Sequence, residues 1–138
     1  MSWYPDLGTE TMIDSGPHVR AIGWLSSKYP YPTGDVPTDV LERIKLHVQH
    51  WLQDQKALNW HSFRGLHQCE LCQQFRSYGN IGVPAGEVLY VFPEMLAHYI
   101  EVHHYLPPAE FMAALMTSPL PGTPEYVEAC LPFRKSES

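Results

Sequence analysis

The sequence predicts a small α+β fold, a single domain over residues 1–138 with a short sheet or β-hairpin and about three helices. A chain of 138 residues is long enough to bury one hydrophobic core. Apolar residues recur at helical spacing over 39–55, whereas the run 88–92 is apolar, β-branched and aromatic, as in a strand. Cysteines and histidines at the spacing of metal ligands lie within 65–104 and predict a zinc module there.

The first third of the chain is rich in turn-forming residues. Residues 1–17 carry a few apolar anchors among them, which predicts a segment that lies over the surface of the fold. Residues 18–25 contain little polarity and predict a short buried strand. The two prolines within 29–34 remove backbone donors and restrict their neighbours, so we expect an ordered loop there.

Helices and strands follow from residue 39 onward. The helix expected over 39–55 begins with a capping box, and the strand expected over 88–92 is followed by Pro93. Proline is favoured in the first helical turn, so we expect a helix from there to His104. A further helix is expected over 108–116, and the proline-rich tail 118–138 is expected to be irregular.

The charge and the termini of the chain restrict the function. Fifteen acidic and nine basic residues give a net charge of −6, which disfavours contact with the phosphates of nucleic acid. There is no apolar stretch of the length that a membrane span needs and no export signal at the N-terminus, so no membrane partner is expected. Three cysteines do not make a secreted disulfide framework, which favours a reducing cytoplasm.

The ligand pattern predicts one structural Zn²⁺ ion. Cys69 and Cys72 form a Cys-x-x-Cys pair, and His98 and His103 follow on the expected helix. Thiolates and imidazoles are the ligands that zinc prefers, and four of them close a tetrahedral site with no position for an activated water. A redox role is disfavoured because the cysteine pair precedes a turn-rich hairpin instead of opening a helix.

Two sets of zinc ligands are consistent with the sequence. On an ideal helix, His98 and His103 lie about 140° apart, so both reach one ion only if the last helical turn is wider than an α turn. In that case the ligands are the two cysteines and both helical histidines. Otherwise one helical histidine ligates together with His67, which lies two residues before Cys69 and on the same side of an extended chain. His47 and His50 are interpreted as a solvated or rim pair outside the site.

Two resemblances add to this interpretation. The order of cysteine knuckle, hairpin and ligand-bearing helix over 65–104 resembles a treble-clef or ββα zinc module. Over residues 4–115, the motifs Gly65-x-His67-x-Cys69-Glu-x-Cys72 and His98-Tyr99-x3-His103-x-Tyr105-x-Pro107-Pro108-x2-Phe111 resemble a bacterial domain family of unknown function. The second resemblance implies a small bacterial protein with a zinc site, and it carries no activity.

The sequence favours a non-enzymatic role. No nucleophile elbow and no phosphate-binding glycine loop is present, and the acidic charge suits a basic protein partner. We therefore expect a zinc-binding protein that acts by protein–protein binding, as an immunity protein or a regulatory adaptor does. The alternative is a metal-dependent nuclease of the ββα-metal type, in which His98 or His103 acts at a different ion. The sequence does not specify the oligomeric state.

Overall fold

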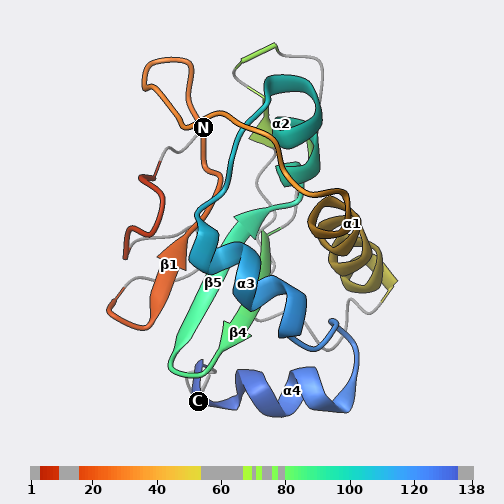
Figure 1. Ribbon diagram of the computed structural model, residues 1–138. Coiled ribbons are helices and arrows are strands. Elements are labelled where there is room, and N and C mark those ends of the chain that lie inside the picture. Colours follow the sequence, from red (N-terminus) through yellow and green to blue (C-terminus); the bar gives the residue numbers. More distant parts are fainter. Residues whose placement is uncertain are drawn as a thin grey trace.

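The computed structural model describes residues 4–9, 16–53, 67–69, 71–72, 76–77 and 80–133 (Figure 1). Within these ranges the chain forms four α-helices and two small sheets, which confirms the predicted α+β class. None of the described helices is long and apolar enough to cross a membrane. In chain order the elements are β1 Val19–Ala21, α1 Thr38–Gln53, β2 His67–Gln68, β3 Arg76–Ser77, β4 Asn80–Ala85, β5 Val88–Pro93, α2 Leu96–His103, α3 Ala109–Thr117, α4 Pro124–Cys130 and the 3-10 helix η2 Leu131–Phe133.

The larger sheet has the strand order β1-β5-β4. Strands β4 and β5 form an antiparallel hairpin, and β1 pairs with β5 in parallel. The hairpin turns at Gly86, whose φ of 68° lies in the left-handed region that glycine adopts without a steric penalty. The smaller sheet pairs β2 with β3 around the cysteine pair. The predicted strands at 18–25 and 88–92 thus correspond to β1 and β5.

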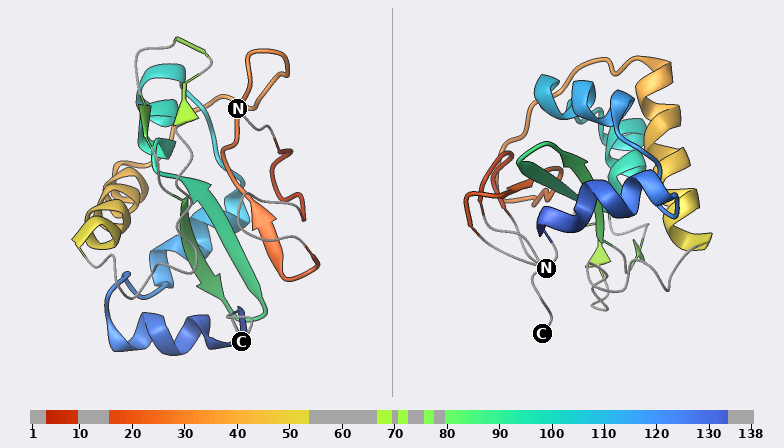
Figure 2. Two further views of the ribbon diagram at one scale, coloured as in Figure 1. Left: turned by 180° about the vertical axis from the view of Figure 1, so that it is seen from behind. Right: turned by 90° about the horizontal axis from the view of Figure 1, so that it is seen from below.

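Both faces of the larger sheet are buried. On one face Ile81, Val83, Tyr90 and Phe92 belong to the main core, which α1, α2 and α3 complete. Figure 1 shows α3 crossing this face, and from behind in Figure 2 the strands lie in front of α3. On the other face, side chains of β1 and β5 pack with Trp24, Phe133 and Tyr4. The N-terminal segment and η2 therefore close the face opposite α1, α2 and α3.

The buried stripe of α1 includes a histidine that we expected to be solvated. The stripe consists of Val40, Ile44, His47 and Trp51, at spacings that place them on one side of the helix. His47 is fully buried, so its interpretation as part of a solvated or rim pair with His50 is wrong. The helical spacing of the apolar residues includes Leu52 in the predicted stripe, but the helix faces the core on the side of His47, and Leu52 is 45% exposed.

Helix α2 begins later than the sequence predicts. The pairing of β4 with β5 extends to Asn80 and Pro93, so Pro93 ends a strand and does not open the helix. A proline is tolerated at the end of a strand because no further ladder hydrogen bond needs its missing N–H. Leu96 is the first helical residue, and Leu96, Tyr99 and Ile100 bury α2 against the core.

The tail predicted to be irregular contains an ordered helix. Pro124 opens α4, and the Oγ1 of Thr123 caps it by accepting a hydrogen bond from the N–H of Tyr126. The hydroxyl of Tyr126 donates to the carbonyl of Gly82 at 2.6 Å, which fixes α4 to β4. The prediction for this segment is wrong because prolines that precede a helix position it and do not prevent it.

The N-terminal segment adds hydrogen bonds to the edge of β1. The N–H of Leu7 donates to the carbonyl of Ala21, and the N–H of Ala21 donates to the carbonyl of Gly8. The Asp6 carboxylate accepts hydrogen bonds from the N–H of Gly23 and from the hydroxyl of Tyr105. Of the segment predicted to lie over the surface, residues 4–9 thus lie along β1, and residues 1–3 and 10–15 lie outside the described ranges.

Candidate metal centre

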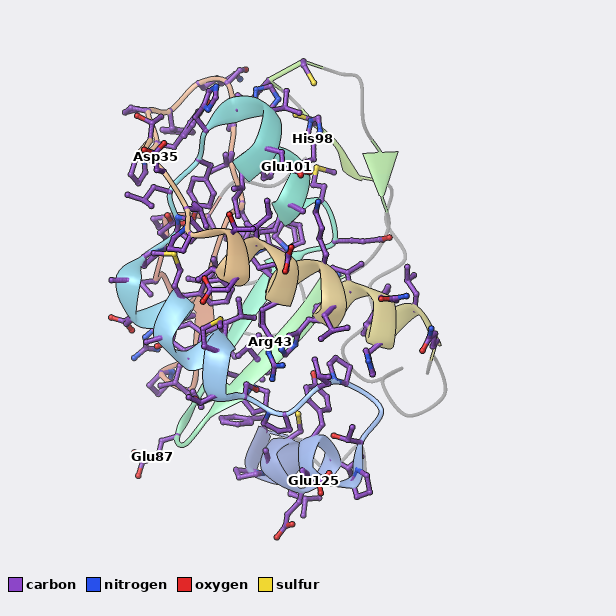
Figure 3. All side chains as sticks on the ribbon, turned by 45° about the vertical axis from the view of Figure 1, so that its right-hand side comes forward. Asp35, Arg43, Glu87, His98, Glu101 and Glu125 are labelled. Carbon is purple, nitrogen blue, oxygen red and sulfur yellow. The ribbon has the colours of Figure 1, made fainter. Side chains whose placement is uncertain are left out.

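Four sulfur and nitrogen atoms converge between the cysteine pair and α2. The Sγ of Cys69 lies 3.4 Å from the Nε2 of His103, and the Sγ of Cys72 lies 3.4 Å from the Nε2 of His98. The two Sγ atoms are 3.8 Å apart, and all four atoms lie within 4.8 Å of one another. These residues could hold a metal ion. Figure 3 shows His98 on α2, at the opposite end of the molecule from Glu125 on α4.

The cysteine pair forms a compact knuckle after β2. Backbone N–H groups of Leu71 and Cys72 donate hydrogen bonds to the sulfur of Cys69. Burial raises the pKa of the Cys69 thiol, and these two N–H groups act in the opposite direction. Such amide donors stabilise a thiolate, which is the form of cysteine that binds a metal ion.

The last turn of α2 explains how two histidines five residues apart converge. The carbonyl of Tyr99 accepts hydrogen bonds from the N–H groups of both His104 and Tyr105. These bonds span five and six residues instead of the four of an α-helix, so the turn is wide. His104 has a φ of 59° and ends the helix in the left-handed region. The ring centroids of His98 and His103 are 5.1 Å apart. The wider turn that both histidines need in order to reach one ion is therefore present.

The surroundings keep the two histidines neutral. Burial lowers the pKa of His98, and the neighbouring His103 lowers it further, while Glu101 opposes the change. Burial also lowers the pKa of His103, with a smaller contribution from His104. Neutral imidazole is the form that donates a nitrogen lone pair to a metal ion. Both rings are therefore in the protonation state of a ligand at neutral pH.

The structure brings together one of the two predicted ligand sets. Cys69, Cys72, His98 and His103 meet, as described above. The backbone of His67 lies in β2, but its side chain lies outside the described part of the structure. The alternative set with His67 is therefore untested. Neither His47 nor His50 belongs to the cluster of ligand atoms in the described ranges.

A tyrosine of the proline-rich loop at 29–34 supports the centre. The hydroxyl of Tyr31 donates to the carbonyl of His103 at 3.1 Å, across 72 residues of sequence. Its ring contacts that of Tyr105, edge to face, at a centroid distance of 6.2 Å. The motif Tyr29-Pro-Tyr-Pro predicts an ordered loop, but nothing in it indicates that it would meet the end of α2. Tyr31 thus fixes the backbone from which one candidate ligand projects.

Comparison with known proteins gives one match. Residues 2–116 match DUF7919, a domain of unknown function. The chain belongs to this family. No curated protein and no solved structure matches the chain. The DUF7919 match contains the complete Cys–His cluster, together with the larger sheet, and ends before α4. The match confirms the expectation that the chain belongs to a family of unknown function.

Proposed function

We propose that this DUF7919 protein binds one structural zinc ion through Cys69, Cys72, His98 and His103, and acts by binding another protein. The observation that carries the metal assignment is the spacing of the four ligand atoms. With Zn–S bonds of about 2.3 Å and Zn–N bonds of about 2.0–2.1 Å, tetrahedral geometry separates two sulfurs by about 3.8 Å and a sulfur from a nitrogen by about 3.5 Å. The corresponding separations here are 3.8 Å and 3.4 Å.

The chemistry of the four residues supports zinc and a structural role. Two thiolates and two imidazoles suit zinc, whereas magnesium and calcium prefer oxygen ligands. Four protein ligands fill a tetrahedral shell, so a bound ion would have no free position for substrate or water. The ion would instead join the Cys69–Cys72 knuckle to α2, and its charge would stabilise the Cys69 thiolate against the effect of burial.

Charge and exposed apolar side chains support the binding of a protein. The net charge of −6 would attract a basic partner and orient it during the encounter. Large apolar side chains are exposed on several separate elements, and a partner could cover one or more of them: Tyr29, Leu52, Val102, Met116 and Leu131. Val102 is 52% exposed and directly precedes His103 on α2. A partner that covers Val102 would contact the helix that carries both candidate histidine ligands.

Metal analysis tests the centre. Protein purified without chelator should contain about one equivalent of zinc, and Cys69→Ser with Cys72→Ser should abolish it. Cys130→Ala is the matched control, because it removes a buried cysteine that is not part of the cluster. Cobalt-substituted protein should show the absorption of a tetrahedral site with thiolate ligands. Metal retained by the double variant would overturn the assignment.

Single histidine variants distinguish the two ligand sets. We expect His98→Gln and His103→Gln each to weaken zinc binding strongly in competition with a chromogenic chelator. His67→Gln should leave the affinity unchanged, as should the control His50→Gln. If His67→Gln loses the metal while one helical variant keeps it, the set that contains His67 is correct.

A nuclease assay tests the absence of catalysis. Plasmid DNA incubated with the purified protein and Mg²⁺, Mn²⁺ or Zn²⁺ should stay intact. Metal-dependent cleavage that disappears in His98→Ala or His103→Ala would replace the structural role with a ββα-metal nuclease.

A further inference from the structure

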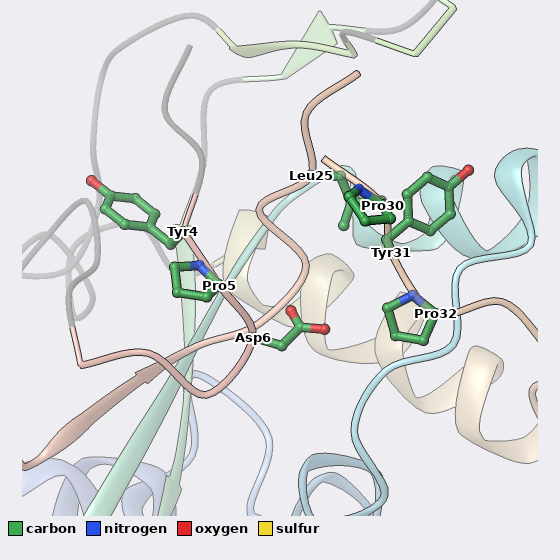
Figure 4. Close-up of a pocket in the computed structure, with 7 residues that line it drawn as sticks. All are labelled: Tyr4, Pro5, Asp6, Leu25, Pro30, Tyr31 and Pro32. Carbon is green, nitrogen blue, oxygen red and sulfur yellow. The ribbon is translucent and has the colours of Figure 1, made fainter. Parts of the chain in front are cut away.

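A cavity of about 220 Å³ lies between the N-terminal segment and the proline-rich loop, and none of the four candidate metal ligands lines it. Its volume equals that of about seven water molecules at about 30 Å³ each, and it is smaller than the roughly 300–1,000 Å³ of most small-molecule sites. It therefore suits a single long side chain better than a complete cofactor. The lining residues, shown in Figure 4, are Tyr4, Pro5, Asp6, Leu25, Pro30, Tyr31 and Pro32.

Asp6 is the charged residue in this lining. In Figure 4 its carboxylate points into the space between the two segments, toward Pro32. One oxygen accepts the N–H of Gly23 at 3.0 Å, and the other accepts the hydroxyl of Tyr105 at 2.7 Å. A carboxylate has about four acceptor positions, so about one remains on each oxygen.

No described lysine or arginine forms an ion pair with Asp6. Burial raises the pKa of this carboxyl, and its two hydrogen bonds act in the opposite direction without reversing the shift. Asp6 is partly buried, and a carboxylate that is partly removed from water gains free energy when a cation pairs with it. The cavity thus presents a negative group that a cation from outside could neutralise.

We propose that this cavity receives the side chain of an arginine on a partner protein, with the guanidinium against Asp6 and the aliphatic stem between the prolines. The inference rests on the proposed function of protein binding and names the chemistry that the partner must present. The remaining acceptor position on each oxygen matches the planar guanidinium, which donates two parallel hydrogen bonds to a carboxylate. The apolar walls suit the three methylene groups that an arginine buries.

Arginine fits better than lysine for two reasons. The ammonium group of lysine is a strongly hydrated point charge, and it cannot use both oxygens in the fixed geometry of the guanidinium fork. Guanidinium is more weakly hydrated, so its transfer into a cavity walled by proline and leucine costs less. The net charge of −6 would also steer a basic partner toward the protein.

A peptide titration monitored by NMR tests the proposal on the unaltered protein. The Gly23 amide is the reporter, because its N–H donates to Asp6. The acetylated and amidated tripeptide Gly-Arg-Gly should shift this signal in a saturable way, with a dissociation constant of about millimolar. The same peptide with neutral, nearly isosteric citrulline should bind about tenfold more weakly or worse, and the lysine peptide should lie between them.

Variants and a small cation supply the controls. Asp6→Asn should weaken arginine-peptide binding about tenfold or more, whereas Asp35→Asn, the same change at an exposed aspartate, should not. Equal binding of citrulline and arginine peptides would overturn the proposal, even if Asp6→Asn does not fold. If methylguanidinium binds as tightly as the peptide, the cavity is a site for free small cations and the assignment to a partner side chain is wrong.

The outcome can be separated from that of the zinc proposal. Each titration is carried out on protein whose metal content has been measured. Arginine-peptide binding without zinc in the protein would refute the metal centre and support the cavity. Zinc-loaded protein that does not bind the peptide would refute the cavity and leave the metal centre intact.

Discussion

His47 is fully buried, and its ring has no hydrogen-bond partner among the described residues. Within the same ranges, the indole N–H of Trp51 and the side-chain amide of Asn80 also have none. Burial lowers the pKa of His47 to about 3, with smaller contributions from the positive charges of Arg43 and His50. Protonation of this ring in the folded state is therefore unfavourable until the pH is far below neutral.

This shift predicts a loss of stability in acid. His47 has a pKa of about 3 when folded and about 6.5 when unfolded, so between these values the unfolded chain binds the proton. The stabilisation is complete above about pH 6.5 and is lost as the pH falls toward 3. Between pH 7 and pH 5 we expect the free energy of unfolding to decrease by about 2 kcal/mol from this residue. Urea denaturation at the two pH values measures it.

Two variants isolate the contribution of His47. His47→Leu removes the titrating ring and both unpartnered nitrogens, and it should lose less stability between pH 7 and pH 5 than the unaltered protein by about 2 kcal/mol. His50→Gln, on the same helix, removes only a small contribution to the pKa of His47, so it should lose nearly as much stability as the unaltered protein. An identical pH dependence in His47→Leu would show that this ring does not cause the acid sensitivity.

Two fully buried tyrosines differ in the group that they bond. Tyr105 donates to the Asp6 carboxylate, and Tyr126 donates to the Gly82 carbonyl. Hydrogen bonds to charged groups contribute more, so Tyr105→Phe should cost about 1.5–3 kcal/mol and Tyr126→Phe about 1 kcal/mol in free energy of unfolding. Chemical denaturation of both variants measures the difference. An equal cost would mean that the charge of Asp6 contributes nothing to this bond.

At the scale of elements, one side chain joins α1 to the end of α3. The guanidinium of Arg43 donates to the carbonyl of Ser118 at 2.7 Å and to that of Leu115 at 3.3 Å. These carbonyls lie at the negative end of α3, where a cation is favoured. The Lys45–Glu101 ion pair joins α1 to α2 at 2.8 Å, but both side chains are about half exposed.

We expect these two connections to contribute unequally. Arg43→Met should lower the free energy of unfolding by about 1.5–3 kcal/mol, because partly buried carbonyls lose a charged donor. Lys45→Met, the matched change on the same helix, should cost less than about 1 kcal/mol, since exposed ion pairs are weak. Thermal or urea unfolding compares them, and the reverse order would contradict the packing of α1 on α3.

Elements dictated by local pattern could be predicted from the sequence, whereas their boundaries depended on tertiary contacts. The stripe that begins at Val40 predicts α1, and the run from Val88 predicts β5. Pro93 fits the first turn of a helix equally well, and only its pairing with Asn80 decides for the strand. Similarly, the prolines after residue 118 predict a loop. The contact that orders α4, between Tyr126 and Gly82, spans 44 residues and leaves no local signal in the sequence.

In the candidate site, too, local sequence pattern could be recognised, whereas features that depend on tertiary contacts could not. Cys69-x-x-Cys72 and the two histidines of α2 are recognisable because ligand spacing is local. Whether both histidines reach one point depended on the backbone after Tyr99, which the ligand spacing does not determine. The support from Tyr31 was not predictable, since its partner lies 72 residues away.

At the scale of the whole molecule, the folding unit is longer than the family match. The DUF7919 match ends at residue 116, yet Tyr126 is fully buried and Phe133 is only 4% exposed. Phe133 covers the sheet face formed by β1 and β5. We expect a chain ended after Met116 to lose cooperative thermal unfolding, and Phe133→Ala to cost about 3–5 kcal/mol by denaturant titration. Native-like unfolding of the shortened chain would contradict this.

Metal removal should act on the whole molecule through one connection. If zinc joins the Cys69–Cys72 knuckle to α2, a strong chelator should lower the Tm by about 5–15 °C, because an ion that binds only the folded state stabilises it. Amide hydrogen exchange should accelerate most in α2. The Cys69→Ser, Cys72→Ser variant should show no chelator effect, and an equal fall in its Tm would indicate that the chelator acts elsewhere.

Residues 103–105 contact both the candidate metal centre and Asp6, the charged residue of the cavity. The ring of His103 approaches Cys69, its carbonyl accepts the hydroxyl of Tyr31, and Tyr105 donates to Asp6. An ion and a guanidinium would thus act close to one short backbone segment, the ion at His103 and the guanidinium at the Asp6 partner of Tyr105. Thermodynamic linkage makes any coupling reciprocal: if zinc raises the affinity for an arginine by some factor, the arginine raises the affinity for zinc by the same factor. A bound partner would then lower the free zinc concentration at which the protein is half loaded.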